Sequence, residues 1–149
     1  MSAAPPANAT AARAAARHSA DYVLRSLNLL GQLSGGHLLT GLVSLALTQA
    51  NVAHLMTKGG YTEIDDIPPD AERRPVSVLS LAASLGLPYE TTRRHVEILI
   101  RGGHCVRVKG GVITPASALD TALHREFLAA NLANLRRLYR GLHALGLDF

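Results

Sequence analysis

The sequence predicts a mainly α-helical fold that carries one small β-hairpin. Hydrophobic residues make up 48% of the 149 residues but aromatic residues only 4%, so the core must consist of Leu, Val and Ala side chains, which suit helices. The apolar residues recur at helical spacing along most of the chain. The alternation of apolar and polar residues that is typical of strands is confined to residues 106–114. The length fits one domain with a substantial core.

The first 17 residues are rich in Ala and Pro and hold few large apolar groups. Such a segment buries too little surface to offset the entropy of ordering it, so we expect residues 1–17 to form a flexible tail. Alanine favours helix, which allows the part from Ala11 onward to extend the next element. Residues 18–149 are expected to form a single domain.

Two helices are predicted between residues 19 and 58. Ser19 can cap a helix that runs to Leu33, and Ser34-Gly35-Gly36 then breaks it. A longer helix is expected over about 37–58. Its stretch Leu38–Leu47 is apolar almost all round, so this helix is either the centre of the monomer or shared with a second copy. Polar residues along it argue against a membrane span.

The central prediction concerns the stretch 73–115. Ser77 is a good N-cap for a helix that ends at Gly86, where glycine takes the left-handed conformation without steric cost. Pro88 suits the start of a second helix, about 89–101. Two short helices joined by a glycine-containing turn form a helix-turn-helix. Thr92, Val96, Leu99 and Ile100 are expected to point inward, and Tyr89, Glu90, Thr91, Arg93, Arg94 and Glu97 outward.

A β-hairpin should follow the second helix. Val106–Val108 and Val112–Thr114 alternate around Lys109-Gly110-Gly111, which is a hairpin pattern. Pro75-Val76 is a candidate for a short strand that pairs with it. Upstream, residues 61–72 form an acidic connector containing Asp65, Asp66, Asp70 and Glu72. Their spacing is irregular and no ligand cluster is near, so a solvated loop is expected there and no metal site.

A C-terminal helix is predicted over 117–145. Its larger apolar residues recur at spacings of four, three, four and three residues, which resembles a heptad seam about two heptads long. These residues are Leu128, Leu132, Leu135, Tyr139 and Leu142. The seam has two interpretations of equal standing. It is either an amphipathic face that packs on the protein's own core or a dimer seam.

The stretch 73–115 resembles the winged helix-turn-helix of bacterial transcription regulators, close to the GntR and MarR types. The matching residues are Leu81-Ala82, Leu85-Gly86-Leu87, Thr91-Thr92-Arg93, Val96, Leu99, Gly103 and Val106–Thr114. Two departures are Thr92, where the family usually has a buried Val or Ile, and His104-Cys105, where an apolar pair usually leads into the wing. The resemblance implies a winged helix-turn-helix with additional N- and C-terminal helices, whose first helix is the one ending near Lys58.

Function follows from the same resemblance. It implies a sequence-specific DNA-binding transcriptional regulator with recognition helix 89–101 in the major groove and wing 106–114 on the backbone or minor groove. We expect a homodimer, because two-fold symmetry doubles the DNA contacts. The base-reading candidates are Tyr89, Glu90, Thr91, Arg93 and Arg94. The phosphate-binding candidates are Arg73, Arg74, Arg107 and Lys109.

The charge distribution agrees with this expectation. The chain carries a net charge of +4, whereas seven basic and two acidic residues give the stretch 73–115 a net charge of +5. A concentrated basic region is what a phosphate-binding surface needs. The alternative is a solvated basic face with no partner. A second alternative is a winged-helix protein–protein interaction module that does not bind DNA directly.

Other function classes find little support in the sequence. The seven histidines form neither an HExxH motif nor a zinc-ligand spacing with cysteine, and there is no phosphate-binding loop or serine elbow, so we expect neither an enzyme nor a cofactor or metal. One cysteine, Cys105, precludes an internal disulfide and fits a reducing cytoplasm. No signal-peptide pattern is present at the N-terminus. No residue set argues for a small-molecule effector, and that question stays open.

Overall fold

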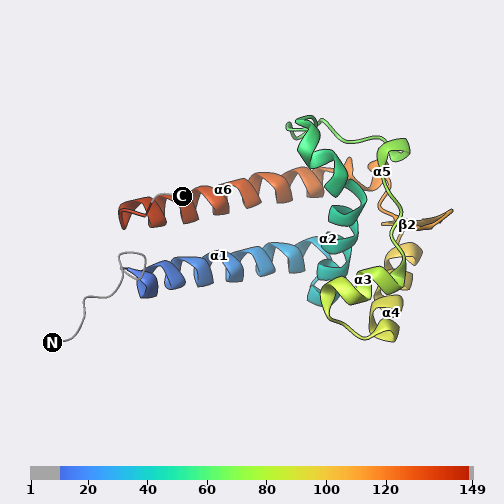
Figure 1. Ribbon diagram of the computed structural model, residues 1–149, viewed down its shortest axis with the longest axis horizontal. Coiled ribbons are helices and arrows are strands. Elements are labelled where there is room, and N and C mark those ends of the chain that lie inside the picture. The colour runs from blue at the N-terminus through green and yellow to red at the C-terminus, as the bar shows by residue number, and fades with distance from the viewer. Residues whose placement is uncertain (1–10, 148–149) are drawn as a thin grey trace.

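The computed structural model describes residues 11–147 and is mainly helical, with one two-stranded antiparallel sheet (Figure 1). The helices are α1 (Ala12–Leu33), α2 (Leu38–Val52), α3 (Val78–Leu85), α4 (Tyr89–Arg101), α5 (Ala116–Leu119) and α6 (Ala122–Ala144). Two short 3-10 helices are η2 (Ala53–Lys58) and η3 (Asp70–Glu72). The strands are β1 (Val106–Val108) and β2 (Gly111–Ile113).

The chain folds into two parts that we name the base and the arm. The base contains α2, α3, α4 and the hairpin β1–β2, packed together at one end of the molecule. The arm is the antiparallel pair of long helices α1 and α6, which project side by side from the base (Figure 1). Both ends of the described chain therefore lie at the tip of the arm.

Helix α2 lies at the centre of the base. Val43 and Leu47 on this helix are fully buried against Leu81 of α3, Val96 of α4 and Val112 of β2. A helix that is apolar almost all round is expected to be surrounded by protein. This face of α2 is surrounded by other elements of the same chain, so it belongs to the monomer core. The α-helix is shorter than predicted, because it ends at Val52 and continues to Lys58 as a 3-10 helix.

The stretch Leu38–Lys58 is long and apolar enough to cross a membrane by length and composition alone, and it is the one such stretch in residues 11–147. Two of its polar residues, Thr40 and Asn51, are nevertheless buried and hydrogen-bonded to other elements of the base. Polar groups bonded in this way are typical of a core helix.

Asn51 of α2 forms hydrogen bonds with two other segments of the chain. Its side-chain amide donates to the carbonyls of Arg74 at 2.8 Å and of Val112 at 3.1 Å. Its side-chain oxygen accepts from the amide of Thr114 at 2.9 Å, and its own carbonyl accepts from the amide of Arg74. The fully buried side chain is thereby satisfied, and it fixes the hairpin and the end of the acidic connector against α2.

The hairpin forms as predicted and is extended by a third short segment. Val106 pairs with Ile113 and Val108 with Gly111 in an antiparallel register. The expected contact of Val76 is also confirmed, since Val76 and Val112 exchange two backbone hydrogen bonds of 3.1 and 2.9 Å. Gly111 lies so close to this segment that a Cβ atom there would come within 2.4 Å of the Val76 carbonyl oxygen. Glycine is therefore required at this crossing.

The terminal helices differ from their predicted bounds. Helix α1 begins at Ala12, so residues 12–17, which were expected in the tail, are helical, and residues 1–10 lie outside the described part of the chain. The predicted helix 117–145 is two helices separated at Asp120. Thr121 caps the second of them by accepting a hydrogen bond from the amide of His124 at 3.1 Å.

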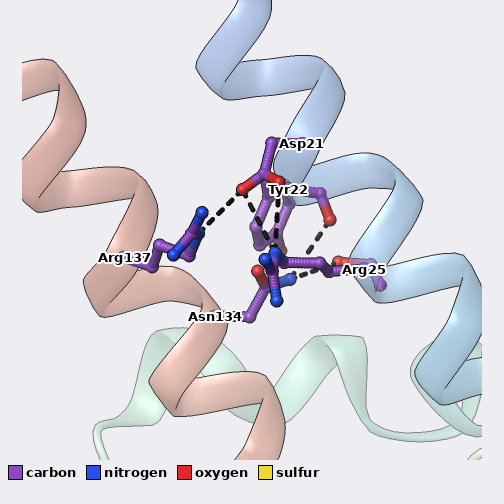
Figure 2. A network of polar contacts seen from close by, with 6 residues as sticks. Asp21, Tyr22, Arg25, Asn134 and Arg137 are labelled. Atoms are coloured by element: carbon purple, nitrogen blue, oxygen red, sulfur yellow. Dashed lines mark hydrogen bonds and ion pairs between the residues drawn. The ribbon is translucent and has the colours of Figure 1, made fainter.

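A polar network on one side of the arm joins its two helices (Figure 2). The Asp21 carboxylate accepts from Arg25 of the same helix at 3.1 Å and from Arg137 of α6 at 2.9 Å, and these arginines hold its pKa below the usual range. Asn134 is buried between the helices and donates to the Tyr22 carbonyl and the Ser26 hydroxyl, both at 3.1 Å. These contacts specify how α1 and α6 align.

Candidate nucleic-acid interface

Helices α3 and α4 are joined by a tight turn whose geometry follows from three residues. Ser77 caps α3 through its hydroxyl, which accepts from the Ser80 amide at 3.1 Å. Gly86 ends the helix in the left-handed conformation (φ 65°). Pro88 then precedes α4 with an extended backbone. All three roles match the sequence prediction.

Helix α4 is held by one buried face. Thr92, Val96 and Leu99 are buried against the rest of the base, as predicted. The Thr92 hydroxyl donates to the Pro88 carbonyl one turn earlier at 3.1 Å, which explains why a threonine is accepted in place of an apolar residue. His95 bonds the hydroxyl of Thr40 on α2 at 2.9 Å. These contacts fix the rotation of α4 and so decide which residues face solvent.

The N-terminal half of α4 presents most of the predicted base-reading side chains. Tyr89, Glu90, Arg93 and Arg94 are exposed, and Thr91 is half-buried. Glu90 and Arg93 form an ion pair with 3.1 Å between carboxylate and guanidinium. Hydrogen bonding from Arg93 lowers the pKa of Glu90, and the same contact raises the pKa of Arg93. Arg94 forms no ion pair or side-chain hydrogen bond within residues 11–147.

The hairpin carries two of the residues that were predicted to contact phosphate, Arg107 and Lys109. Lys109 is exposed at its turn. Arg107 on β1 is exposed but forms an ion pair with Glu97 of α4. This pair joins the hairpin to the solvent-facing side of α4, so Arg107 contributes less free positive charge than the sequence suggested. Arg74 is exposed, and its backbone is held by Asn51.

The prediction that Arg73 contacts phosphate is wrong. Its side chain is buried, and a guanidinium nitrogen donates to the Pro68 carbonyl at 2.9 Å, while Asp70 lies 3.9 Å away. Burial lowers the pKa of this guanidinium. Asp70 in turn accepts from the backbone amide of Ala116 at 2.7 Å. Arg73 therefore braces the acidic connector from inside the fold.

The structure also refines the charge distribution. The residues outside 73–115 carry a net charge of only −1, but that value conceals two opposite regions. The helices of the arm together carry a net charge of +5, and residues 61–72 of the acidic connector carry −5. Two separate basic surfaces therefore exist, one on the base and one on the arm.

Cys105 and the histidines are candidate reactive or metal-binding residues in the sequence. The Cys105 thiol is buried in the core at the start of β1, and burial raises its pKa to about 11, which disfavours the reactive thiolate. Within residues 11–147 no group of three or more His, Cys, Asp or Glu side chains is arranged to hold a metal ion. Sequence reasoning missed Asn51, because a polar residue in an apolar helix gives no signal of the partners it will reach.

The chain matches no protein-family model, no curated protein and no solved structure.

Proposed function

We propose that the protein is a sequence-specific DNA-binding transcriptional regulator of the winged helix-turn-helix type, acting as a homodimer in the cytoplasm. Helix α4 would lie in the major groove as the recognition helix, and the hairpin would be the wing on the backbone or minor groove. The observation that carries the proposal is the orientation of α4. Its buried face is fixed by Val96 and Leu99, so that Tyr89 and Arg94 project freely from its N-terminal half.

Exposed basic residues of the stretch 73–115 support this proposal. Arg74, Arg94, Arg101 and Lys109 are exposed basic residues that form no ion pair within the described chain, which suits contact with phosphates and base edges. No catalytic residue, metal or cofactor belongs to the proposal. The acidic residues of the connector lie away from α4, beside the start of α6, where they would not oppose a phosphate backbone.

The second candidate is a winged-helix protein–protein interaction module that does not bind DNA directly. Exposed apolar side chains on the base favour it, since Leu79 of α3 is 68% exposed and Ile98 of α4 is 44% exposed. DNA binding is preferred because Arg94, exposed in the N-terminal half of α4, forms no ion pair or side-chain hydrogen bond within residues 11–147.

A gel shift with pooled genomic fragments, repeated at increasing salt, distinguishes the two candidates. The wild-type protein should shift DNA with an affinity that falls as salt rises. Arg93→Ala combined with Arg94→Ala should weaken binding at least tenfold, because a base-reading arginine contributes about 1–3 kcal/mol. Lys58→Ala, which removes an exposed charge from η2, is the control and should bind like wild type. Unchanged affinity of the double variant would refute the proposal.

A further inference from the structure

The arm has an apolar face that nothing within residues 11–147 covers. Val23, Leu24 and Leu27 of α1 are 46%, 67% and 36% exposed. On α6 the middle of the heptad-like seam points outward, with Leu132 47%, Leu135 41% and Tyr139 68% exposed, whereas Leu128 and Leu142 at its ends are half-buried. The middle of the seam therefore does not pack on the protein's own core, which was one of its two sequence interpretations.

The two apolar strips lie on the same side of the arm. Successive residues of a helix are about 100° apart, so Val23, Leu24 and Leu27 lie about 140° round α1 from the side that faces α6. The seam of α6 lies about 140° round that helix from Asn134 and Gly141, which face α1. On each helix the strip is displaced from the facing side in the direction of increasing residue number. Because the helices run antiparallel, these two displacements carry both strips to the same side of the arm. By the same rule Asp21, Arg25 and Arg137 lie about 60–100° round their helices in the opposite sense, so their polar network, drawn in Figure 2, occupies the other side.

The size of this face suits a protein interface. Each arm helix has 22 or 23 residues, so the arm is about 33 Å long and, with two helices, about 20 Å wide. The resulting surface of roughly 650 Å² is close to the ~800 Å² that each partner contributes to a standard stable interface.

The charges of the molecule indicate which partner fits. The outer half of the arm carries the exposed residues Arg13, Arg17, Arg136 and Arg140. The acidic connector lies at the opposite end, where Asp65 pairs with Arg125 in the first turn of α6 at 3.0 Å. Glu63 and Asp66 of the connector are exposed. In two arms that pack antiparallel, the basic tip of each reaches the acidic connector of the other. Parallel arms would instead place the two basic tips together.

We propose that a second copy of this chain covers the apolar face, with the two arms packed antiparallel as a four-helix bundle and each basic tip against the partner's acidic connector. This inference rests on the homodimer in the proposed function but not on DNA binding. A two-fold axis across the middle of the arms sets the two bases beyond opposite ends of the bundle.

Sedimentation velocity at about 10 μM tests the proposal. The wild-type protein should sediment as a dimer. Leu24→Glu combined with Leu132→Glu places charge in the apolar face and should give a monomer, with helicity by circular dichroism unchanged because both side chains are exposed in the monomer. The matched control is Gln32→Glu combined with Ala133→Glu, which adds the same charge to exposed positions on the other side and should stay dimeric.

The charge pairing has its own test. Arg17→Glu combined with Arg136→Glu should raise the dimer dissociation constant at least tenfold. Adding Glu63→Lys and Asp66→Lys should restore most of the affinity. Spin labels on Ala144→Cys at the arm tips should be about 33 Å apart in an antiparallel dimer, whereas parallel arms would bring them within about 20 Å.

Three results would overturn the inference. These are a monomeric wild-type protein at 50 μM, a dimer that survives the Leu24→Glu and Leu132→Glu substitutions, and a monomer that binds phosphatidylserine-containing vesicles through the same face. DNA binding is measured separately. A dimer that fails to shift DNA would refute DNA binding and leave this inference standing. A DNA-binding monomer would overturn this inference and the homodimer, and leave DNA binding standing.

Discussion

Arg93 pairs with Glu90 one turn earlier in α4, with 3.1 Å between guanidinium and carboxylate, whereas the neighbouring Arg94 projects without such a partner within the described chain. The two arginines point about 100° apart, as neighbours on a helix must. The sequence does not distinguish them, because it does not show which one Glu90 holds. The structure makes Arg94 the free group and therefore the better candidate for base reading.

Replacing Arg94 with Ala should weaken specific DNA binding by about 1–3 kcal/mol, or roughly 5- to 150-fold, and should relax preference at one base position. Replacing Arg93 with Ala should cost less, because its charge is already offset by Glu90. Fluorescence anisotropy against a selected site and a scrambled site measures both effects. A larger specific loss for Arg93→Ala would reverse the assignment.

Replacing Asn51 with Ala should lower the free energy of unfolding by about 3 kcal/mol. The substitution leaves the buried Thr114 amide without its Asn51 partner, which costs about 1–3 kcal/mol, and it also removes the Asn51 hydrogen bonds to the carbonyls of Arg74 and Val112. Urea unfolding followed by circular dichroism measures the change. Gln49→Ala, an exposed position two residues earlier on α2, is the control and should change stability by less than about 0.5 kcal/mol. An equally small effect at Asn51 would contradict its role as the clamp of the base.

Replacing Gly111 with Ala should detach the hairpin from the segment at Val76. The new methyl group would meet the Val76 carbonyl at 2.4 Å, and the glycine's φ of 147° is also strained for alanine. We expect loss of hydrogen-exchange protection at the amides of Val76 and Val112, together with weaker DNA binding if the hairpin acts as a wing. Gly60→Ala, where an added Cβ meets no atom within 4 Å, should leave both measurements unchanged.

The Cys105 thiol should be inert in the native protein. Because burial raises its pKa to about 11, the thiol stays protonated at pH 8 and inaccessible, so a disulfide exchange reagent should label it quickly only after unfolding. The raised pKa also makes the free energy of unfolding depend on pH. The folded state retains its proton where the unfolded state loses it, so this contribution is complete below about pH 8.5 and falls as pH rises towards 11. Cys105→Ala should remove this part of the loss of stability at alkaline pH. Rapid labelling of the native thiol would contradict this placement.

The local structure of the base was predictable because its signals are short-range. Ser77, Gly86 and Pro88 act through their own backbones, so the bounds of α3 and α4 follow from the residues themselves. The same holds for the turn of the hairpin at Lys109 and Gly110. The pairing of Val76 with Val112 was also anticipated, since the extended Pro75-Val76 pair favours a strand.

Longer-range features were not predictable in this way. Arg73 is basic and adjacent to Arg74, yet only the path of the connector decides that one is buried against Pro68 while the other is exposed. The seam of α6 and the apolar residues of α1 were visible as patterns, but their relative side depends on how the polar network around Asn134 aligns the helices. Likewise, the net charge outside the base concealed the opposite charges of arm and connector.

Selection of bound fragments from a random double-stranded DNA pool tests sequence-specific recognition most directly. The wild-type protein should enrich one motif, arranged as an inverted repeat with half-site centres about one helical turn apart. The variant with both Arg93→Ala and Arg94→Ala should enrich no motif while keeping the helicity of the wild type. If the folded wild-type protein enriches no motif, or if the double variant enriches the same one, α4 is not a DNA recognition helix.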